Sequence, residues 1–345
     1  MRQPLIALGV VVLLIGAGAL AYVLGVGRLA PPTAPGSVVF VAISRSSDEA
    51  DAHEIEAIDL EAGTRDLFDL GRRITALAVS ADRRSLYVGL DAGRIALLDA
   101  TTGLTFGQVD LGGPTIVSLV PSADGSTLYA IAVTNIASSI VPIDLATRKA
   151  GDPITFAQPV GPAVLRGDTL LVPLGDVRGI QVAFVDVKAL SVTSRLTLPR
   201  GSLVTPMAFP INGTRTGIVA VDPSGSGVAG LRLYAMADQA HWSDVLLQMP
   251  PTLSGRQIGF SLQAVAAANG TIHVCAVAAG TAARRYVVTA DLKATSAGTD
   301  CGPLAGGDLV VMGKRDPAQL LVLDQRTGKT ARTLPLAGVP ARLVH

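Results

Sequence analysis

The sequence predicts an all-β protein made of repeated antiparallel sheets, preceded by one N-terminal transmembrane helix. Three observations predict it. A strand–turn–strand unit recurs loosely about every 40 to 45 residues from Val38 onward, an uncharged apolar run lies near the start of the chain, and 37 glycines and 21 prolines among 345 residues suit a fold rich in turns. Apolar residues make up 49% of the chain and charged residues 16%, which excludes general disorder.

The first predicted element is the apolar run at residues 5–26, which holds 22 residues and no charge. Its length matches the roughly 20 residues that a helix needs to cross a bilayer core. We expect the N-terminus to stay in the cytoplasm and the rest of the chain to be exported. Ala19-Leu20-Ala21 matches a cleavage pattern, so a cleaved signal peptide is the alternative. The apolar run continues past that point, which favours an uncleaved anchor.

A short Pro-rich segment at residues 28–37 (RLAPPTAPGS) follows the run and should form an extended, semi-rigid linker. Residues 1–37 contain two arginines and no acid, so the remainder has 26 Lys+Arg against 27 Asp+Glu and a formal charge of −1. A chain this close to neutral is not built for nucleic acid or for electrostatic binding to anionic lipid. We expect contact with the membrane through the N-terminal helix alone.

Two copies of the repeat are plain in the remainder. The segment that begins at Ser80 (SADRRSLYVG) recurs 42 residues later at Ser122 (SADGSTLYAI). Each copy predicts a strand, a polar turn at Ala-Asp and a second strand that opens with Leu-Tyr, because β-forming residues follow the turn.

A second element follows each copy, namely a short apolar strand that ends in Asp and leads into a turn. The Asp side chain can accept backbone N–H bonds across the turn, and a glycine four residues on supplies the positive φ that the chain needs there. The predicted structural residues of these turns are Asp59, Asp99, Asp144, Asp186 and Asp324, with Gly63, Gly103 and Gly328. Less regular copies end near Ala235 and Asp291, which makes seven units.

A period of this size with four short strands per unit indicates a seven-bladed β-propeller. The repeat region opens with a predicted second strand at residues 38–43 and finishes with a predicted first strand at residues 339–344, so pairing the two would close the ring. The expected organisation is a transmembrane signal anchor at residues 1–27, a linker at 28–37 and an extracytoplasmic propeller at 38–345. The irregular blades leave six or eight units as alternatives.

The SAD-x-x-x-LYV pattern, followed by LLD-x-x-TG, resembles the YVTN family of β-propeller repeats. The resemblance covers blades two and three and the third strand of the last blade, and it implies a WD40-like or quinoprotein-like seven-bladed ring. YVTN-like propellers include lactonase-type enzymes and non-catalytic surface or periplasmic proteins, so the fold does not select a function. Quinone-type repeats carry a tryptophan shortly after the turn, whereas Trp242 is the only tryptophan of this chain. We therefore expect no cofactor.

The innermost strands of a propeller meet around its central channel, where catalytic groups would lie. The candidate inner strands are residues 75–80, 115–120, 162–165, 204–209, 260–265 and 339–344. Together they offer one ionisable side chain, Arg342, and neither the paired carboxylates nor the histidine cluster that acid–base catalysis or a metal site needs. The sequence therefore predicts no catalytic, cofactor or metal residues, although loops could still supply them.

The two cysteines, Cys275 and Cys301, lie 26 residues apart within the sixth unit. In an oxidising compartment they could form a disulfide that staples one blade. The alternative is a small buried residue at Cys275 and a free thiol at Cys301.

These observations favour a non-catalytic, membrane-anchored, extracytoplasmic propeller that acts as a protein-binding or accessory subunit of a cell-envelope complex. Its binding surface would be one face of the ring, and the best candidate segments are residues 222–230 and 238–251. The alternative is a YVTN lactonase-like hydrolase of a small lactone or ester, which would need acids and a His or Arg at one mouth of the channel. A quinone- or metal-dependent oxidoreductase is a third hypothesis, which the missing repeat tryptophans disfavour.

Overall fold

The computed structural model describes residues 36–46, 51–175, 179–199, 202, 205–222, 230–238, 241–248, 260–278 and 283–345. The chain divides into two compact units, residues 1–33 and 34–345. The first unit, which holds the predicted anchor, lies outside the described residues, and so does most of the linker. Within the described ranges no helix is long and apolar enough to cross a membrane.

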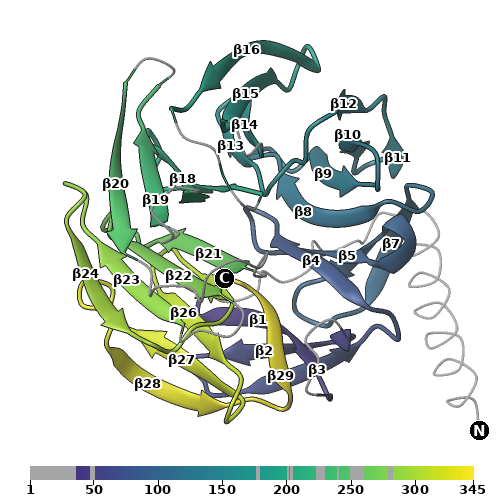
Figure 1. Cartoon of the computed structure of the whole chain (residues 1–345). Helices are drawn as coiled ribbons and strands as arrows, with labels where there is room; N and C mark the ends of the chain where they lie inside the picture. Colours follow the sequence, from purple (N-terminus) through teal and green to yellow (C-terminus); the bar gives the residue numbers. More distant parts are fainter. Residues whose placement is uncertain are drawn as a thin grey trace, which may run out of the picture. The chain divides into compact units, whose positions relative to one another are not determined.

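The described residues of the second unit form seven antiparallel sheets arranged as the blades of a ring (Figure 1). Blade 1 consists of β29 (Val339–Val344), β1 (Val38–Ser44), β2 (Glu54–Asp59) and β3 (Arg65–Asp69). Blade 2 consists of β4 (Ile74–Val79), β5 (Ser85–Leu90), the short 3₁₀ turn η2 (Asp91–Gly93), β6 (Arg94–Asp99) and β7 (Thr105–Asp110). Blade 3 consists of β8 (Thr115–Pro121), β9 (Thr127–Val133), β10 (Ser138–Asp144) and an outer strand in two pieces, β11 (Lys149–Ala150) and β12 (Ile154–Phe156).

The remaining four blades follow in chain order. Blade 4 consists of β13 (Val164–Arg166), β14 (Thr169–Leu174), β15 (Gln181–Asp186) and β16 (Ser191–Thr197). Blade 5 consists of β17 (Met207–Pro210), β18 (Thr216–Asp222), β19 (Gly230–Met236) and β20 (Trp242–Gln248). Blade 6 consists of β21 (Phe260–Ala266), β22 (Ile272–Ala278), β23 (Arg284–Val288) and β24 (Ala294–Gly298), and blade 7 of β25 (Leu304–Ala305), β26 (Val310–Lys314), β27 (Gln319–Leu323) and β28 (Thr330–Pro335).

The ring closes through blade 1, whose innermost strand comes from the C-terminal end of the chain. Strand β29 pairs antiparallel with β1, and Phe40 lies opposite Val344. The predicted seven-bladed ring, and its closure by the two end strands, are therefore confirmed. The pairing satisfies a backbone edge of β1 that would otherwise be open.

The core lies between the blades, because each sheet buries both of its faces against its neighbours. All seven residues of β1 are buried, and the middle residues of β5, β14 and β15 are buried as well. The outermost strands instead expose most of their side chains, as β28 and β24 show. Polar outer strands protect the free sheet edges from pairing with other chains.

The repeat-turn aspartates adopt one common hydrogen-bonding arrangement at the ends of the third strands. Oδ1 of Asp99 accepts the backbone N–H groups of Thr101 and Thr102 at 3.0 and 2.8 Å, and Oδ1 of Asp59 accepts those of Glu61 and Ala62 at 2.8 and 3.0 Å. The same carboxylate-to-backbone contacts occur at Asp144, Asp186 and Asp324. These contacts tie the chain into the tight turn that leads to the outer strand.

The hydrogen bonds lower the pKa of four of these carboxyl groups. The largest contribution comes from the N–H of Ala62 for Asp59, of Thr147 for Asp144 and of Ala189 for Asp186. For Asp324 the hydroxyl of Thr327 contributes most. Donors that favour the ionised form keep these carboxylates charged in the turn.

The predicted inner strands differ from the observed ones in length and in number. Strand β25 has only two residues, and it supplies a seventh inner strand that the sequence patterns did not predict. Strand β13 has three residues and begins at Val164. Strands this short carry too few alternating residues to give a periodic signal.

Candidate functional site

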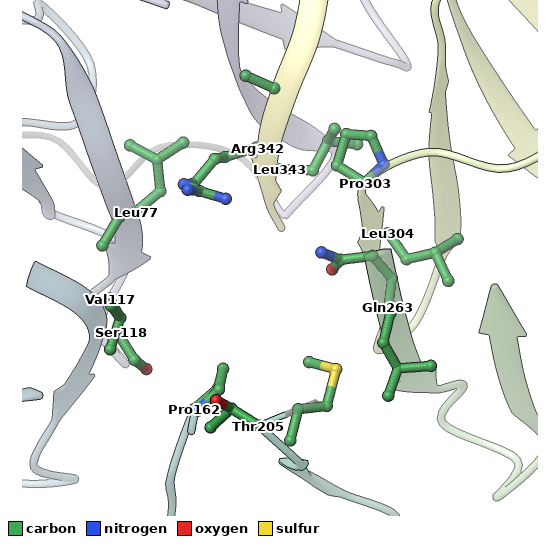
Figure 2. Close-up of a pocket in the computed structure, with 14 residues that line it drawn as sticks. Leu77, Val117, Ser118, Pro162, Thr205, Gln263, Pro303, Leu304, Arg342 and Leu343 are labelled. Carbon is green, nitrogen blue, oxygen red and sulfur yellow. The ribbon is translucent and has the colours of Figure 1, made fainter. Parts of the chain in front are cut away.

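The inner strands surround a cavity of about 400 Å³ at the centre of the ring (Figure 2). Ten of its lining side chains are apolar, and they come from β4, β8, β17, β21, β25, β29 and the segments just before β13 and β25. They are Ala76, Leu77, Val117, Pro162, Met207, Leu262, Pro303, Leu304, Ala341 and Leu343. Four polar side chains complete the described lining, namely Ser118, Thr205, Gln263 and Arg342. A cavity of this size and mixed lining suits a small molecule.

Arg342 is the one ionisable side chain in the described lining, as the sequence predicts. Its guanidinium points into the cavity (Figure 2). The Nε–H donates a hydrogen bond to the backbone carbonyl oxygen of Thr75 at 2.5 Å, which ties blade 1 to blade 2. Burial by surrounding protein atoms, followed by the positive charge of Arg73, lowers the pKa of Arg342. An arginine nevertheless stays protonated at any physiological pH.

Irregular strand pairing explains how Arg342 and Thr75 meet. The register between β1 and β29 shifts at Ala341, which leaves Arg342 directly after an extra residue. The register between β4 and β5 shifts at Thr75 in the same way. A bulge turns a side chain or a carbonyl group out of the regular ladder. The two bulges therefore bring the Arg342 side chain and the Thr75 carbonyl group together at the wall of the channel.

A second cavity of about 290 Å³ adjoins the first and shares Gln263, Pro303, Ala341 and Arg342 with it. Its remaining wall comes from blades 6 and 7. The paired charges of Asp300 and Lys314, 3.5 Å apart, lie in that wall. Arg342 and Gln263 thus stand where the two cavities meet.

A third hollow of about 880 Å³ lies over blades 1 and 2. Its lining contains Arg45 and Arg72, which pair with Glu54 and Asp91 at 2.6 and 3.3 Å. Arg73 also lines this hollow and is exposed. Two of its three arginines therefore form exposed ion pairs of the ordinary surface kind, whereas Arg73 forms none among the described residues.

The two cysteines are joined by a disulfide, with Cα atoms 5.5 Å apart. Cys275 lies on β22 and is 2% exposed, and Cys301 lies in the connection from β24 to β25. The bond therefore fastens blade 6 to the chain that enters blade 7, and both cysteines line the second cavity. The disulfide lies beside the channel without contributing a reactive thiol to it.

The four histidines are held by separate partners in different parts of the ring. His273 is fully buried, and its Nε2 lies 2.8 Å from the carbonyl oxygen of Gln325 in blade 7. Burial lowers the pKa of His273, so the buried ring is neutral near pH 7. His345 contacts the carbonyl oxygen of Gly36, His53 contacts that of Asp51, and His241 contacts the carboxylate of Asp238 at 2.8 Å. Within the described residues no group of three or more His, Cys, Asp or Glu side chains gathers as a metal site.

Of the two segments predicted to form a binding face, residues 222–230 lie mostly outside the described residues and residues 238–251 lie partly outside them. Residues 223–229 belong to the undescribed part of the chain, as do 239–240 and 249–251. The described part of the second segment is β20, where Trp242 packs edge-on against Tyr234 with ring centroids 5.7 Å apart. Trp242 is therefore partly buried in blade 5.

No protein-family model and no curated protein sequence matches the chain. Many solved structures do match it. The periplasmic gluconolactonase of Pseudomonas aeruginosa is 15% identical, with a TM-score of 0.63 over 89% of this chain and 98% of that one. A functionally unknown protein from Desulfotomaculum acetoxidans is 11% identical, with a TM-score of 0.60 over 89% and 97%.

The WD40 repeats of RRP9 also match, at 14% identity and a TM-score of 0.55 over 79% of this chain and 84% of that one. Identities this low show the fold alone. The chain is thus a seven-bladed β-propeller that resembles lactonase-type and WD40 propellers.

Proposed function

We propose that the chain is a non-catalytic β-propeller, anchored in the cell membrane by its N-terminal segment, that acts as a protein-binding or accessory subunit of a cell-envelope complex. The observation that carries the proposal is the composition of the channel wall. The described lining of the 400 Å³ cavity contains Arg342 but no carboxylate or imidazole, whereas Asp300 and Asp316 line the adjoining cavity. Hydrolysis needs a general base or an activated nucleophile within reach of the substrate, and this lining offers neither.

Two features support the extracytoplasmic location in this proposal. Structural disulfides such as Cys275–Cys301 persist in oxidising compartments outside the cytoplasm. The uncharged run at residues 5–26 has the length of a membrane-spanning helix. A rigid ring on a short linker would present its loops to partners close to the membrane surface.

The test is affinity purification of the tagged full-length chain in mild detergent, with mass spectrometry of the proteins recovered. The matched control carries residues 1–37 fused to an unrelated soluble domain, so it reports what the membrane segment alone retains. We expect a partner in near-equal amount with the full chain and not with the control. Recovery of the chain alone, even after gentle crosslinking, would overturn the proposal.

A second candidate function is hydrolysis of a small lactone or ester. Arg342 favours it, because its guanidinium projects into a 400 Å³ cavity of a fold shared with a gluconolactonase. A cation in that position could polarise a carbonyl group. The same purified chain distinguishes the two functions, since this candidate expects lactone hydrolysis above the spontaneous rate and no stoichiometric partner.

A further inference from the structure

Among the described residues that line the channel, Arg342 carries the one positive charge. None of the ion pairs among the described residues includes Arg342 or Arg73. Burial, and after it the positive charge of Arg73, lowers the pKa of Arg342. Arg73 is exposed and lines a different hollow, so an anion bound in the channel would meet the charge of Arg342.

A hydrogen bond orients the guanidinium of Arg342, although the residue is exposed to the channel. Its Nε–H is occupied by the carbonyl oxygen of Thr75 at 2.5 Å, and this carbonyl group belongs to a bulge residue. The two terminal nitrogens remain for the cavity, into which the group points (Figure 2). The parallel N–H groups at that end match the two oxygens of a carboxylate.

Three neutral polar side chains from other blades share the cavity with Arg342. Gln263 comes from β21 in blade 6, Ser118 from β8 in blade 3 and Thr205 from the segment before β17 in blade 5. The Gln263 amide points into the cavity, as the Arg342 guanidinium does (Figure 2). Hydroxyl and amide groups can donate and accept hydrogen bonds, so they would bind the polar body of a ligand whose charge is held by Arg342.

We propose that the channel binds a small organic acid, whose carboxylate contacts the terminal nitrogens of Arg342 and whose remaining polar groups meet Gln263, Ser118 and Thr205. The cavity of about 400 Å³ has room for a molecule of this class. The site is independent of the proposed protein-binding role, because it lies inside the ring rather than on its loops.

The test is isothermal titration calorimetry of the purified full-length chain in mild detergent at low ionic strength. The probes are succinate and citrate, with succinamide as a neutral molecule of the same size as succinate. We expect at least one of the acids to bind one-to-one at millimolar concentration or tighter, and succinamide to bind about tenfold more weakly or not at all. No binding of either acid, or equal binding of succinamide, would overturn the proposal.

Two matched variants locate the site. Arg342→Gln should weaken binding of the acid about tenfold or more, because it removes the charge and the parallel N–H groups. Arg326→Gln changes an exposed arginine in the turn between β27 and β28 and should leave the affinity unchanged. Unchanged affinity in Arg342→Gln would contradict the proposal.

Two further readouts remain decisive if Arg342→Gln folds poorly. The comparison of succinate with succinamide on the unaltered chain needs no variant. Inorganic phosphate, titrated in the same way, should bind less tightly than the acid, since the tetrahedral ion leaves Gln263, Ser118 and Thr205 without a partner. Phosphate that binds as tightly as the acids would show a general anion site and would overturn the carboxylate assignment.

Discussion

At the scale of single residues, the turn after the third strand imposes the same backbone conformation on different side chains. The residue four positions after the turn aspartate has a positive φ in five blades. It is Gly63, Gly103 or Gly328 in three of them, with φ of 72°, 69° and 68°. Arg148 and Leu190 hold the same position in the other two, with φ of 58° and 48°. The aspartate–backbone bonds therefore set the turn even where no glycine relieves the strain.

Two of these glycines should respond differently to the same substitution. Gly63→Ala adds a Cβ that meets no atom within 4 Å, so it should cost only the backbone strain of about 1 kcal/mol. Gly103→Ala adds a Cβ that would overlap the buried ring of Phe68, so it should cost about 2 to 4 kcal/mol in total. Denaturant unfolding of the two variants measures the difference. Equal losses of unfolding free energy in the two variants would show that the Phe68 side chain moves aside at no cost.

At the scale of elements, arginines bridge the seams between neighbouring blades by donating to backbone carbonyl groups. Arg83 of blade 2 donates to Val38 of blade 1 at 2.7 Å, and Arg332 of blade 7 donates to Leu60 of blade 1 at 2.5 Å. Arg166 and Arg215 make the same kind of contact from blade 4 to 5 and from blade 5 to 6. Charged donors to carbonyl oxygens make stronger hydrogen bonds than neutral donors, so they align the blades specifically.

The disulfide should contribute to stability as an element of the seam between blades 6 and 7. The Cys275→Ala/Cys301→Ala double variant should lower the free energy of unfolding by about 3 kcal/mol, because it releases the constraint on the unfolded chain. Denaturant unfolding measures the loss. Cys301→Ala alone should lose a similar amount, since either substitution breaks the bond. A chain whose unfolding is the same with and without a reductant would contradict this expectation.

The sequence predicted the long buried strands and the turns well, and the short inner strands poorly. Strands such as β5 and β9 combine apolar residues with the preceding Ser-Ala-Asp turn, so composition and turn chemistry agree. Strand β25 owes its place to Leu304, which packs between blades 6 and 7, and to Ala305, which packs between blades 7 and 1, rather than to any local pattern. Arg342 was predicted to line the channel, but its bond to Thr75 depends on two bulges between strands far apart in the sequence. Local patterns contain no signal for such a contact.

At the scale of the whole molecule, stability depends on the strand that closes the ring. Deletion of residues 339–345 should lower the free energy of unfolding by about 5 kcal/mol, because it exposes one edge of β1 and removes the Arg342–Thr75 bond. The truncated chain should also self-associate through that edge. Thermal unfolding and size-exclusion chromatography measure the two effects. A synthetic peptide of residues 338–345 should restore part of the stability by pairing with β1, and failure of the truncation to destabilise the ring would contradict this role for β29.

The closure between β1 and β29 also has a consequence for the order of folding. The two strands come from opposite ends of the ring-forming chain, so this pairing closes a far longer loop than any other strand pairing in the described ring. The entropic cost of closing a loop rises with its length, and folding slows as contacts become less local. Hairpins inside each blade should therefore form first and shorten the distance between β1 and β29 before these two strands pair. While the polypeptide is still being synthesised, the N-terminal blade stays incomplete until its last strand has left the ribosome.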